Sequence, residues 1–114
     1  MPPVTAFAPD IAHWKWSQEE KVIARRAFDM ALRQELDDVI RETKARSAQI
    51  AQPSDLWDLE SYLTQRRTQI DREFDYRYSV LPVVFARLIR TGRLTEHDLD
   101  GLAEDKLKFI RQMK

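Results

Sequence analysis

The sequence predicts an all-α fold with one long N-terminal helix, a second helix of medium length and two shorter C-terminal helices. Only 2 glycines occur in 114 residues, whereas tight β-hairpins depend on residues that tolerate positive φ. No short stretch alternates cleanly between apolar and polar side chains, as a half-buried strand does. Apolar residues recur three or four positions apart instead, which is the spacing of an amphipathic helix.

The composition indicates one globular domain behind a loose N-terminus. Residues 1–16 carry three prolines and no periodicity, so we expect a flexible leader there. Apolar residues make up 43% of the chain and charged residues 33%, a balance typical of folded proteins. Residues 17–114 should form a single helical domain, with the long helices of a dimer stem over 17–78 and a C-terminal helical head over 79–114.

The first helix is predicted from Gln18 to about Ile50. Ser17 and Glu20 have the spacing of a capping box, in which each side chain accepts a hydrogen bond from the other residue's backbone N–H. Pro53 ends the helix, because the residue before a proline avoids helical backbone angles. Its apolar face is formed by Phe28, Leu32, Leu36, Val39, Thr43 and Ile50, and is widened by Met30, Ala31 and Ile40.

The second helix is predicted to start after Ser54 and to run toward residues 75–78. Arg67 falls inside its apolar stripe, where a guanidinium must be paired or must reach water. Arg67 forms a salt bridge, within the chain or across a dimer, or it lines a groove that binds a partner, and both can hold for a residue beside a dimer seam. Trp57, on the flank of the helix, is likewise either a core anchor or an interface hot spot. The stripe consists of Leu56, Leu59, Leu63, Ile70 and Phe74.

The third and fourth helices are shorter. We expect the third over Ser79–Gly92, with Pro82 in its first turn and Gly92 ending it in a left-handed conformation. This helix is apolar nearly all round and should therefore be buried. The fourth helix should begin after Thr95, with acidic side chains at its positive end.

The length of the first helix predicts a homodimer. A helix of about 33 residues spans about 50 Å, whereas a compact chain of this size has a radius of gyration of about 13 Å. The shorter helices cannot cover the whole apolar face, and a second copy across a two-fold axis is the simplest cover. The alternative is that the first helix bends near its middle or frays at one end.

The sequence offers no catalytic, metal-binding or cofactor-binding motif. There is no cysteine, and His13 and His97 stand in no metal-ligand spacing. The glycine motifs that bind nucleotides and the nucleophile motif of hydrolases are absent as well. We therefore expect no enzymatic activity, no metal and no cofactor.

Charge and hydropathy argue against other partners. The 19 basic residues balance 19 acidic ones, which weighs against nucleic-acid binding. The longest apolar run is too short to span a bilayer and is interrupted by Arg87, and the chain does not open with a signal-peptide pattern. We expect a cytoplasmic protein without membrane insertion. A nucleic-acid-binding or antitoxin-like helical dimer is the alternative from another class.

Several segments, in order, resemble the fluorescence recovery protein family. They are "WSQEE", "RQELDDVI", "SAQIAQPSDLWDLESYLTQRRTQID", "YSVLPVVFARLIRTGRL" and "LAEDK", spread over residues 16–110. The resemblance implies an all-helical homodimer without enzymatic activity or cofactor. It further implies binding to the C-terminal domain of the photoactivated orange carotenoid protein. The expected effect is a faster return of that protein to its inactive orange form, which ends quenching of the phycobilisome.

The resemblance also implies roles for single residues. Trp57 and Arg67 match positions that act on the partner. Ile40 and Leu56 match the dimer seam of the family. At the same seam we expect their stripe neighbours Leu36, Val39 and Leu63.

Partner-facing positions depart from the family pattern. Glu60 and Ser61 stand where a His-Asp pair is typical, Val83 replaces an aromatic residue and Phe109 replaces a lysine. The seam positions stay apolar while these change. The scaffold is therefore expected to be kept and the recognition surface altered. The alternative is a fluorescence-recovery-like homodimer with a different protein partner.

Overall fold

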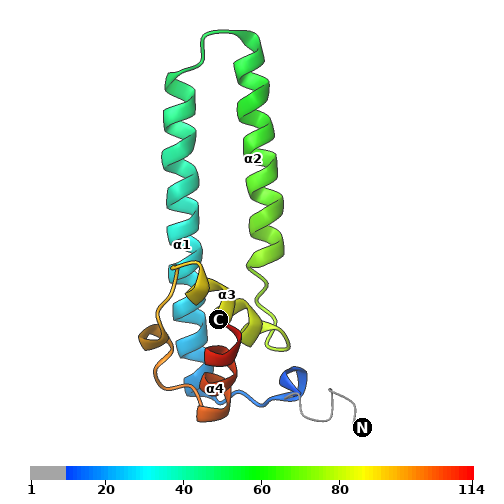
Figure 1. Cartoon of the computed structure of the whole chain (residues 1–114), viewed down its shortest axis with the longest axis vertical. Coiled ribbons are helices and arrows are strands. Elements are labelled where there is room, and N and C mark those ends of the chain that lie inside the picture. The colour runs from blue at the N-terminus through cyan, green and yellow to red at the C-terminus, as the bar shows by residue number, and fades with distance from the viewer. Residues whose placement is uncertain (1–9) are drawn as a thin grey trace.

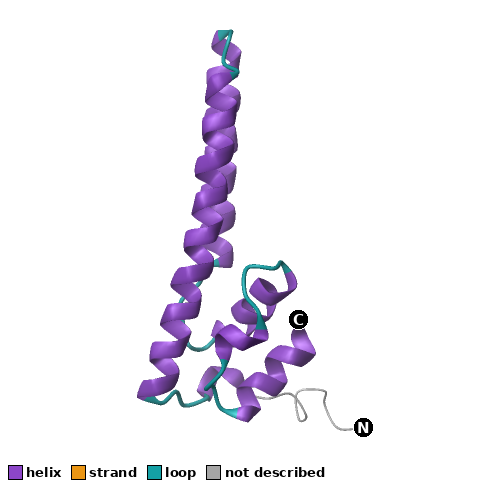
Figure 2. Ribbon diagram, turned by 90° about the vertical axis from the view of Figure 1, so that its left-hand side faces the viewer, coloured by secondary structure: helices purple, strands orange, loops and turns teal. Residues whose placement is uncertain are grey.

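A computed structural model describes residues 10–114, and every regular element in that range is a helix (Figures 1 and 2). The expected all-α class is confirmed. The first nine residues of the predicted leader lie outside the described range. In chain order the elements are η2 (Ile11–His13), α1 (Gln18–Ala48), α2 (Pro53–Glu73), α3 (Leu81–Arg90), η3 (Glu96–Leu99) and α4 (Glu104–Met113).

The molecule is a two-helix stem standing on a small helical head. α1 and α2 run antiparallel as a hairpin, and α3, η3 and α4 gather around the N-terminal half of α1 (Figure 1). The radius of gyration is 18.0 Å and the extents are 59 × 35 × 19 Å, whereas a compact chain of this length has a radius of gyration of about 13 Å. A single chain is therefore elongated rather than compact.

The head contains the apolar core, and α1 contributes to it directly. Ala24, Phe28 and Ala31 of α1 are buried against Leu81 and Phe85 of α3. The predicted boundary at residue 79 therefore does not separate stem from head, because the first half of α1 belongs to the head. The free stem consists of the second half of α1 and most of α2.

The start of α1 follows its predicted cap. The Glu20 N–H donates to Ser17 Oγ over 3.1 Å, and the Ser17 N–H donates to Glu20 Oε1 over 2.9 Å. The helix continues unbroken for 31 residues. The helix is therefore not interrupted in its middle, and it ends at Ala48, just short of the predicted end near Ile50.

The bounds of α2 differ slightly from the prediction. The helix starts at Pro53 rather than after Ser54, because the Asp55 carboxylate caps it by accepting the N–H groups of Ala51 and Gln52 over 2.9 and 3.0 Å. It ends at Glu73, short of residues 75–78.

Helix α3 is buried as predicted, with Leu81, Val84, Phe85, Ala86 and Leu88 all in the core. It begins two residues after Ser79, which does not cap it, since Val80 precedes the first helical residue. Gly92 follows it with φ of 81°, the left-handed conformation that was expected.

The predicted fourth helix is interrupted. Thr95 caps the short helix η3, but the chain then turns at Gly101, with φ of 105°, before α4 begins at Glu104. A Cβ atom on Gly101 would lie 2.5 Å from Ile23 Cδ1 of α1. A helix running straight on from Thr95 is therefore wrong, because the chain turns here in a conformation that favours glycine and brings its backbone against α1.

The end of the leader is docked on the head by Lys106 of α4. The Lys106 ammonium is 2.9 Å from Glu20 Oε2 and donates to the Lys15 carbonyl over 2.8 Å. It also lies over the rings of Trp14 and Trp16, 5.9 and 5.0 Å from their centroids. Because Trp16 is buried, the last residues of the predicted flexible leader are part of the head.

Candidate functional site

One face of the stem carries large apolar side chains that the chain itself leaves open. Exposed fractions are 40% for Leu36 and 47% for Ile40 on α1, and 49% for Leu56 and 38% for Leu63 on α2. Val39 is partly buried. These are the residues predicted for the dimer seam, and their exposure leaves them free to contact a second molecule.

The phase of the two helices puts these side chains on the same side of the hairpin. Glu35 and Arg66 mark the directions in which α1 and α2 face each other. At about 100° per residue, Leu36 lies about 100° beyond Glu35, and Leu63 lies about 60° beyond Arg66. In two antiparallel helices, side chains displaced by the same sense of rotation from the direction in which the helices face each other lie on the same side of the hairpin. The exposed residues therefore form one apolar stem face, made up of Leu36, Ile40, Leu56 and Leu63.

Arg66, not Arg67, is the arginine of α2 that meets α1. Arg66 Nη2 is 2.8 Å from Glu35 Oε1, and the two side chains are only 21% and 11% exposed. Arg67 is exposed and forms no ion pair or side-chain hydrogen bond with residues 10–114. The salt bridge within the chain that was considered for Arg67 is thus not formed, and this cation lies at the outer edge of the apolar stem face.

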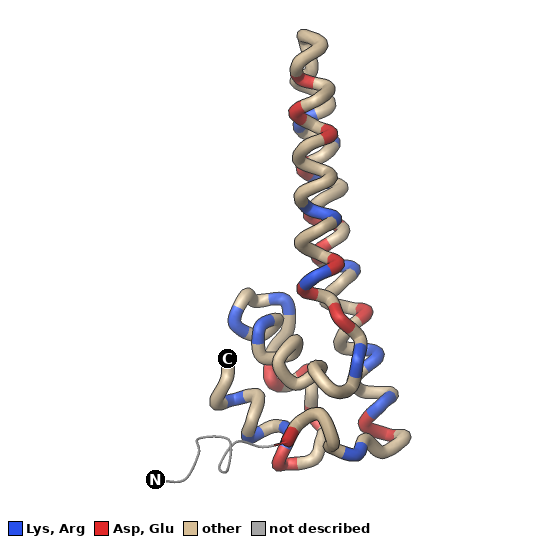
Figure 3. Tube along the Cα trace, turned by 90° about the vertical axis from the view of Figure 1, so that its right-hand side faces the viewer, with Lys and Arg blue, Asp and Glu red and all other residues tan. Residues whose placement is uncertain are grey.

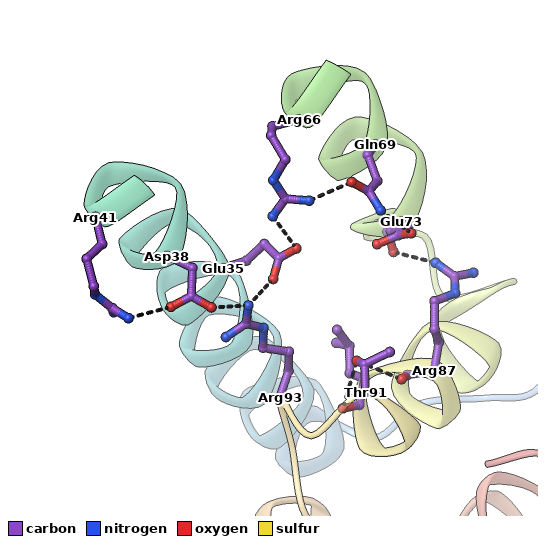
Figure 4. A network of polar contacts seen from close by, with 10 residues as sticks. Glu35, Asp38, Arg41, Arg66, Gln69, Glu73, Arg87, Thr91 and Arg93 are labelled. Atoms are coloured by element: carbon purple, nitrogen blue, oxygen red, sulfur yellow. Dashed lines mark hydrogen bonds and ion pairs between the residues drawn. The ribbon is translucent and has the colours of Figure 1, made fainter. Parts of the chain in front are cut away.

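The Glu35–Arg66 pair belongs to a polar network that joins three parts of the chain (Figure 4). Glu35 Oε2 is 2.5 Å from Arg93, which follows α3 and also pairs with Asp38. Asp38 in turn is 3.1 Å from Arg41. The network therefore ties α1 to α2 and to the segment after α3.

The network shifts the acidity of its members. The hydrogen bond that Arg66 donates to Glu35 raises the pKa of Arg66, and the hydrogen bond that Arg93 donates to Asp38 lowers the pKa of Asp38. Both shifts favour the charged forms, so these groups are ionised at neutral pH.

Open clefts flank the bridge between Glu35 and Arg66. A cleft of about 530 Å³ lies toward the stem tip, lined by Asp38, Arg41, Glu42, Ala45, Tyr62, Arg66 and Arg93. A second cleft of about 330 Å³ lies toward the head, where the Arg87 guanidinium donates to the Glu73 carbonyl over 3.2 Å. Polar contacts rather than packed apolar side chains therefore join α2 to α1 at this level.

Four of the predicted partner-binding residues lie on α2. Trp57 is 63% exposed, and Glu60, Ser61 and Arg67 are exposed as well. Trp57 is close to the tip of the stem, and Arg67 follows ten positions later, about 15 Å along the helix. Exposure of Trp57 excludes its role as a core anchor within one chain.

The other two predicted residues lie in the head, away from this group. Val83 is in α3 and Phe109 in α4, and both are partly buried. Phe109 meets Trp14 edge-to-face, with ring centroids 5.7 Å apart. A single chain therefore does not bring all six predicted partner-binding residues into one site.

Four residues that organise the stem and head were missing from the sequence prediction: Glu35, Arg66, Arg93 and Lys106. A signal for the first two exists in the sequence. Glu35 lies seven residues after Phe28, and Arg66 lies seven residues after Leu59, so each stands where a heptad repeat places a core side chain.

The described part of the chain offers little for metal chemistry. Residues 10–114 contain no group of three or more side chains suited to hold a metal ion. His13 and His97 are exposed and pair with neighbouring carboxylates, Asp10 at 2.7 Å and Asp100 at 2.6 Å. Among the same residues, no helix combines the length and apolar character that crossing a membrane requires.

Both signs of charge are interspersed along the stem (Figure 3). The fold and the site thus define a class: an all-helical protein whose candidate site is an apolar stem face with charged edges. Comparison with known proteins gives the family.

Residues 16–114 match the family described as "Photoprotection regulator fluorescence recovery protein". The chain is 38% identical over 109 residues to the fluorescence recovery protein of Synechocystis sp. (strain ATCC 27184 / PCC 6803 / Kazusa), covering 96% of this chain and 94% of that protein. The chain therefore belongs to the fluorescence recovery protein family, which confirms the resemblance. This is a family of photoprotection regulators.

The fold agrees with solved structures of the family. The Fremyella diplosiphon fluorescence recovery protein has a TM-score of 0.81 at 38% identity, with 87% of this chain and 97% of that chain covered. The protein from Synechocystis sp. PCC 6803 has the same TM-score at 37% identity and the same coverage.

Proposed function

We propose that this chain acts as a homodimer that binds the photoactivated orange carotenoid protein and accelerates its return to the inactive orange form. The chain would bind the conformation through which the carotenoid protein returns to the orange form more tightly than it binds the activated conformation. This differential binding would lower the barrier to the return. Quenching of the phycobilisome would end as a result. The proposal assigns no chemical step to the chain.

The apolar stem face is the observation that carries the dimer. Leu36, Ile40, Leu56 and Leu63 are each between 38% and 49% exposed and share one side of the hairpin. A contiguous apolar patch of this kind on a soluble chain marks an interaction site. A second copy fits it, because a two-fold axis brings identical apolar faces together.

Trp57 and Arg67 support the partner-binding part. An exposed tryptophan and an exposed arginine that pairs with none of residues 10–114, both on one helix, are the residue types that dominate protein–protein hot spots. Both lie beside the apolar stem face rather than in the core. A dimer through that face would thus leave them at its rim, where a partner can reach them.

The test follows recovery in the dark. The orange carotenoid protein is photoactivated, the chain is added in stoichiometric excess, and absorbance records the return to the orange form. The recovery time should shorten markedly compared with the carotenoid protein alone. An unchanged recovery time would contradict the proposed activity, and a light-scattering mass of one 13.5 kDa chain would contradict the dimer.

A second candidate is the same dimer with a different protein partner. Phe109 packs against Trp14 instead of presenting the lysine typical of the family, and Glu60 brings an acidic group to the edge of the stem face. Capture of the carotenoid protein by the immobilised chain distinguishes the two candidates, since only the first predicts it.

A further inference from the structure

Glu35 and Arg66 occupy positions where a two-helix hairpin ordinarily carries apolar side chains. In α2 one heptad series reads Leu59, Arg66 and Glu73, next to a second series of Leu56, Leu63 and Ile70. In α1 the facing series reads Phe28, Glu35 and Glu42. A polar residue at a core position of a coiled coil fixes register and partner choice at a cost in stability.

Between Arg66 and the tip, the apolar stripe of α2 does not point at α1, since Leu56 and Leu63 are exposed. At about 100° per residue, the centre of the stripe lies about 55° beyond Arg66. If α2 turned by that angle, Leu63 would face α1 and Arg66 would swing into solvent. Burial of apolar area within one chain therefore favours a rotation of α2 other than the one observed.

At its head end α2 is held by apolar contacts, because Ile70 is buried and Phe74 packs against Phe28. From Arg66 toward the tip, the contacts across the hairpin that oppose this rotation are polar. Arg66 donates to Glu35 Oε1 of α1 over 2.8 Å, and its hydrogen bond to Gln69 Oε1 over 2.5 Å, within α2, orients the guanidinium for that contact. Nearer the tip, the Arg46 guanidinium lies 4.2 Å from the centroid of the Tyr62 ring. The clefts on both sides of the bridge show that apolar packing does not hold α2 at this level.

We infer that Glu35 is a positioning residue: acting through Arg66, it sets the rotation of α2 and keeps Leu56 and Leu63 turned outward. Its consequence for activity rests on the proposed function, which needs that face open for the second copy. The Glu35 side chain is 11% exposed and enclosed by Arg66 and Arg93. It therefore acts by orienting other residues and not by contact with a partner.

The test separates rotation from stability by replacing both charges with apolar side chains. Replacement of a complete buried ion pair by apolar residues of similar size is often neutral or stabilising, whereas removal of one partner is destabilising. The variant is the double substitution Glu35→Leu with Arg66→Met, in which Arg93 keeps Asp38 as its partner. The matched control is Glu104→Leu with Arg111→Met, the same exchange at an exposed pair on α4.

Rotation is read directly from spin labels. The chain has no cysteine, so Lys44→Cys on α1 and Thr64→Cys on α2 give two labels at exposed positions. Labelled chains are diluted with unlabelled ones, so that only distances within a chain are recorded. Melting temperature, circular dichroism and dark recovery of the carotenoid protein are measured on the same variants without the labels.

The double variant should keep the melting temperature of the wild type, shift and broaden the label distance, and lose several-fold in acceleration of recovery. The single substitution Arg66→Lys, which keeps a cation opposite Glu35, should keep a label distance close to that of the wild type. An unchanged distance in the double variant overturns the inference. Loss of its helical signal overturns it too, since the bridge would then support the fold itself. If wild-type chain fails to accelerate recovery, the proposed function falls while the label distance still decides the rotation.

Discussion

The Arg66 guanidinium lies 2.8 Å from the Glu35 carboxylate, and this pair joins the two helices of the stem where the stem meets the head. Glu35 also binds Arg93, so one largely buried carboxylate serves two cations from different segments. Loss of the carboxylate alone would leave Arg66 half-buried beside α1 without its partner.

We therefore expect Glu35→Ala to destabilise the fold. With one partner of a mostly buried pair removed, the free energy of unfolding should fall by about 2 kcal/mol. Urea denaturation followed by circular dichroism measures it. Asp37→Ala, which breaks only the exposed pair with Arg33, should change the free energy by no more than about 0.5 kcal/mol. Equal effects of the two substitutions would contradict the role given to Glu35.

A charge on the apolar stem face should separate the proposed dimer. Ile40→Glu places a carboxylate where two copies would exclude water, so the light-scattering mass should fall to that of one 13.5 kDa chain. Met113→Glu is the matched control, because Met113 and Ile40 are both 47% exposed and Met113 lies at the end of α4. A dimer that survives Ile40→Glu would place the interface elsewhere.

Arg67→Leu should impair recovery more than assembly. Arg67 forms no ion pair with residues 10–114, so its loss removes no contact that holds the described fold. The dark recovery of the carotenoid protein should slow several-fold toward the rate without regulator, at an unchanged mass. Arg72→Leu changes another exposed arginine of α2, on a different face, and should keep the wild-type rate. If Arg67→Leu yields only monomers, Arg67 is instead a salt-bridge residue across the dimer.

The stability of the head should fall in acid because of Glu20. Burial alone would raise the pKa of Glu20, but hydrogen bonds from the Ser17 and Ala103 N–H groups and from Lys106 outweigh it and lower the pKa below 4.5. A lowered pKa in the folded state means that stability is fully present above the unfolded value and is lost as the pH falls through the folded value. Urea titrations at neutral pH and below pH 4.5 should show this loss. Glu20→Gln should be less stable at neutral pH and should flatten the acid dependence.

The two glycines provide a matched pair for backbone strain. Gly92→Ala meets no atom within 4 Å and should cost only the penalty of its φ of 81°, about 1 kcal/mol. Gly101→Ala should cost more, because its Cβ would lie 2.5 Å from Ile23 Cδ1. Ile23→Val, which removes that atom, should recover part of the loss in the Gly101→Ala background. Thermal unfolding of these three variants measures the costs, and equal costs for the two glycines would contradict the close contact.

Features that depend on contacts between residues close in sequence, such as helix caps and helix ends, were predictable from the sequence. Ser17 and Glu20 lie within one turn of each other, so their cap was readable from spacing alone. Gly92 ends α3 for the same reason, since a left-handed residue after a helix depends on its immediate neighbours. The exposure of Leu36 and Leu63 follows from their position on an apolar stripe longer than the head, and their place in a dimer seam stays a prediction.

Features set by distant contacts were not predictable in this way. A helical wheel gives the width of the α2 stripe but not the direction in which α1 lies. That direction is marked by Arg66, whose partner Glu35 is 31 residues away, so the wheel alone could not tell which of the two neighbouring arginines meets α1. The break at Gly101 likewise depends on Ile23 in another helix. From the sequence alone Lys106 resembles an ordinary surface lysine, because Glu20 and Trp16, which surround it in the fold, are far away in sequence.

The uninterrupted run of α1 from Gln18 to Ala48 has a mechanical consequence. The N-terminal half of α1 is packed in the head and its C-terminal half forms one helix of the hairpin, with no interruption between the two halves (Figure 2). The rod therefore behaves as a cantilever: a load applied near Trp57 at the free end is transmitted as a bending moment to Phe28 and Phe85 at its root. A partner that binds at the tip of the stem therefore also exerts a force on the core of the head.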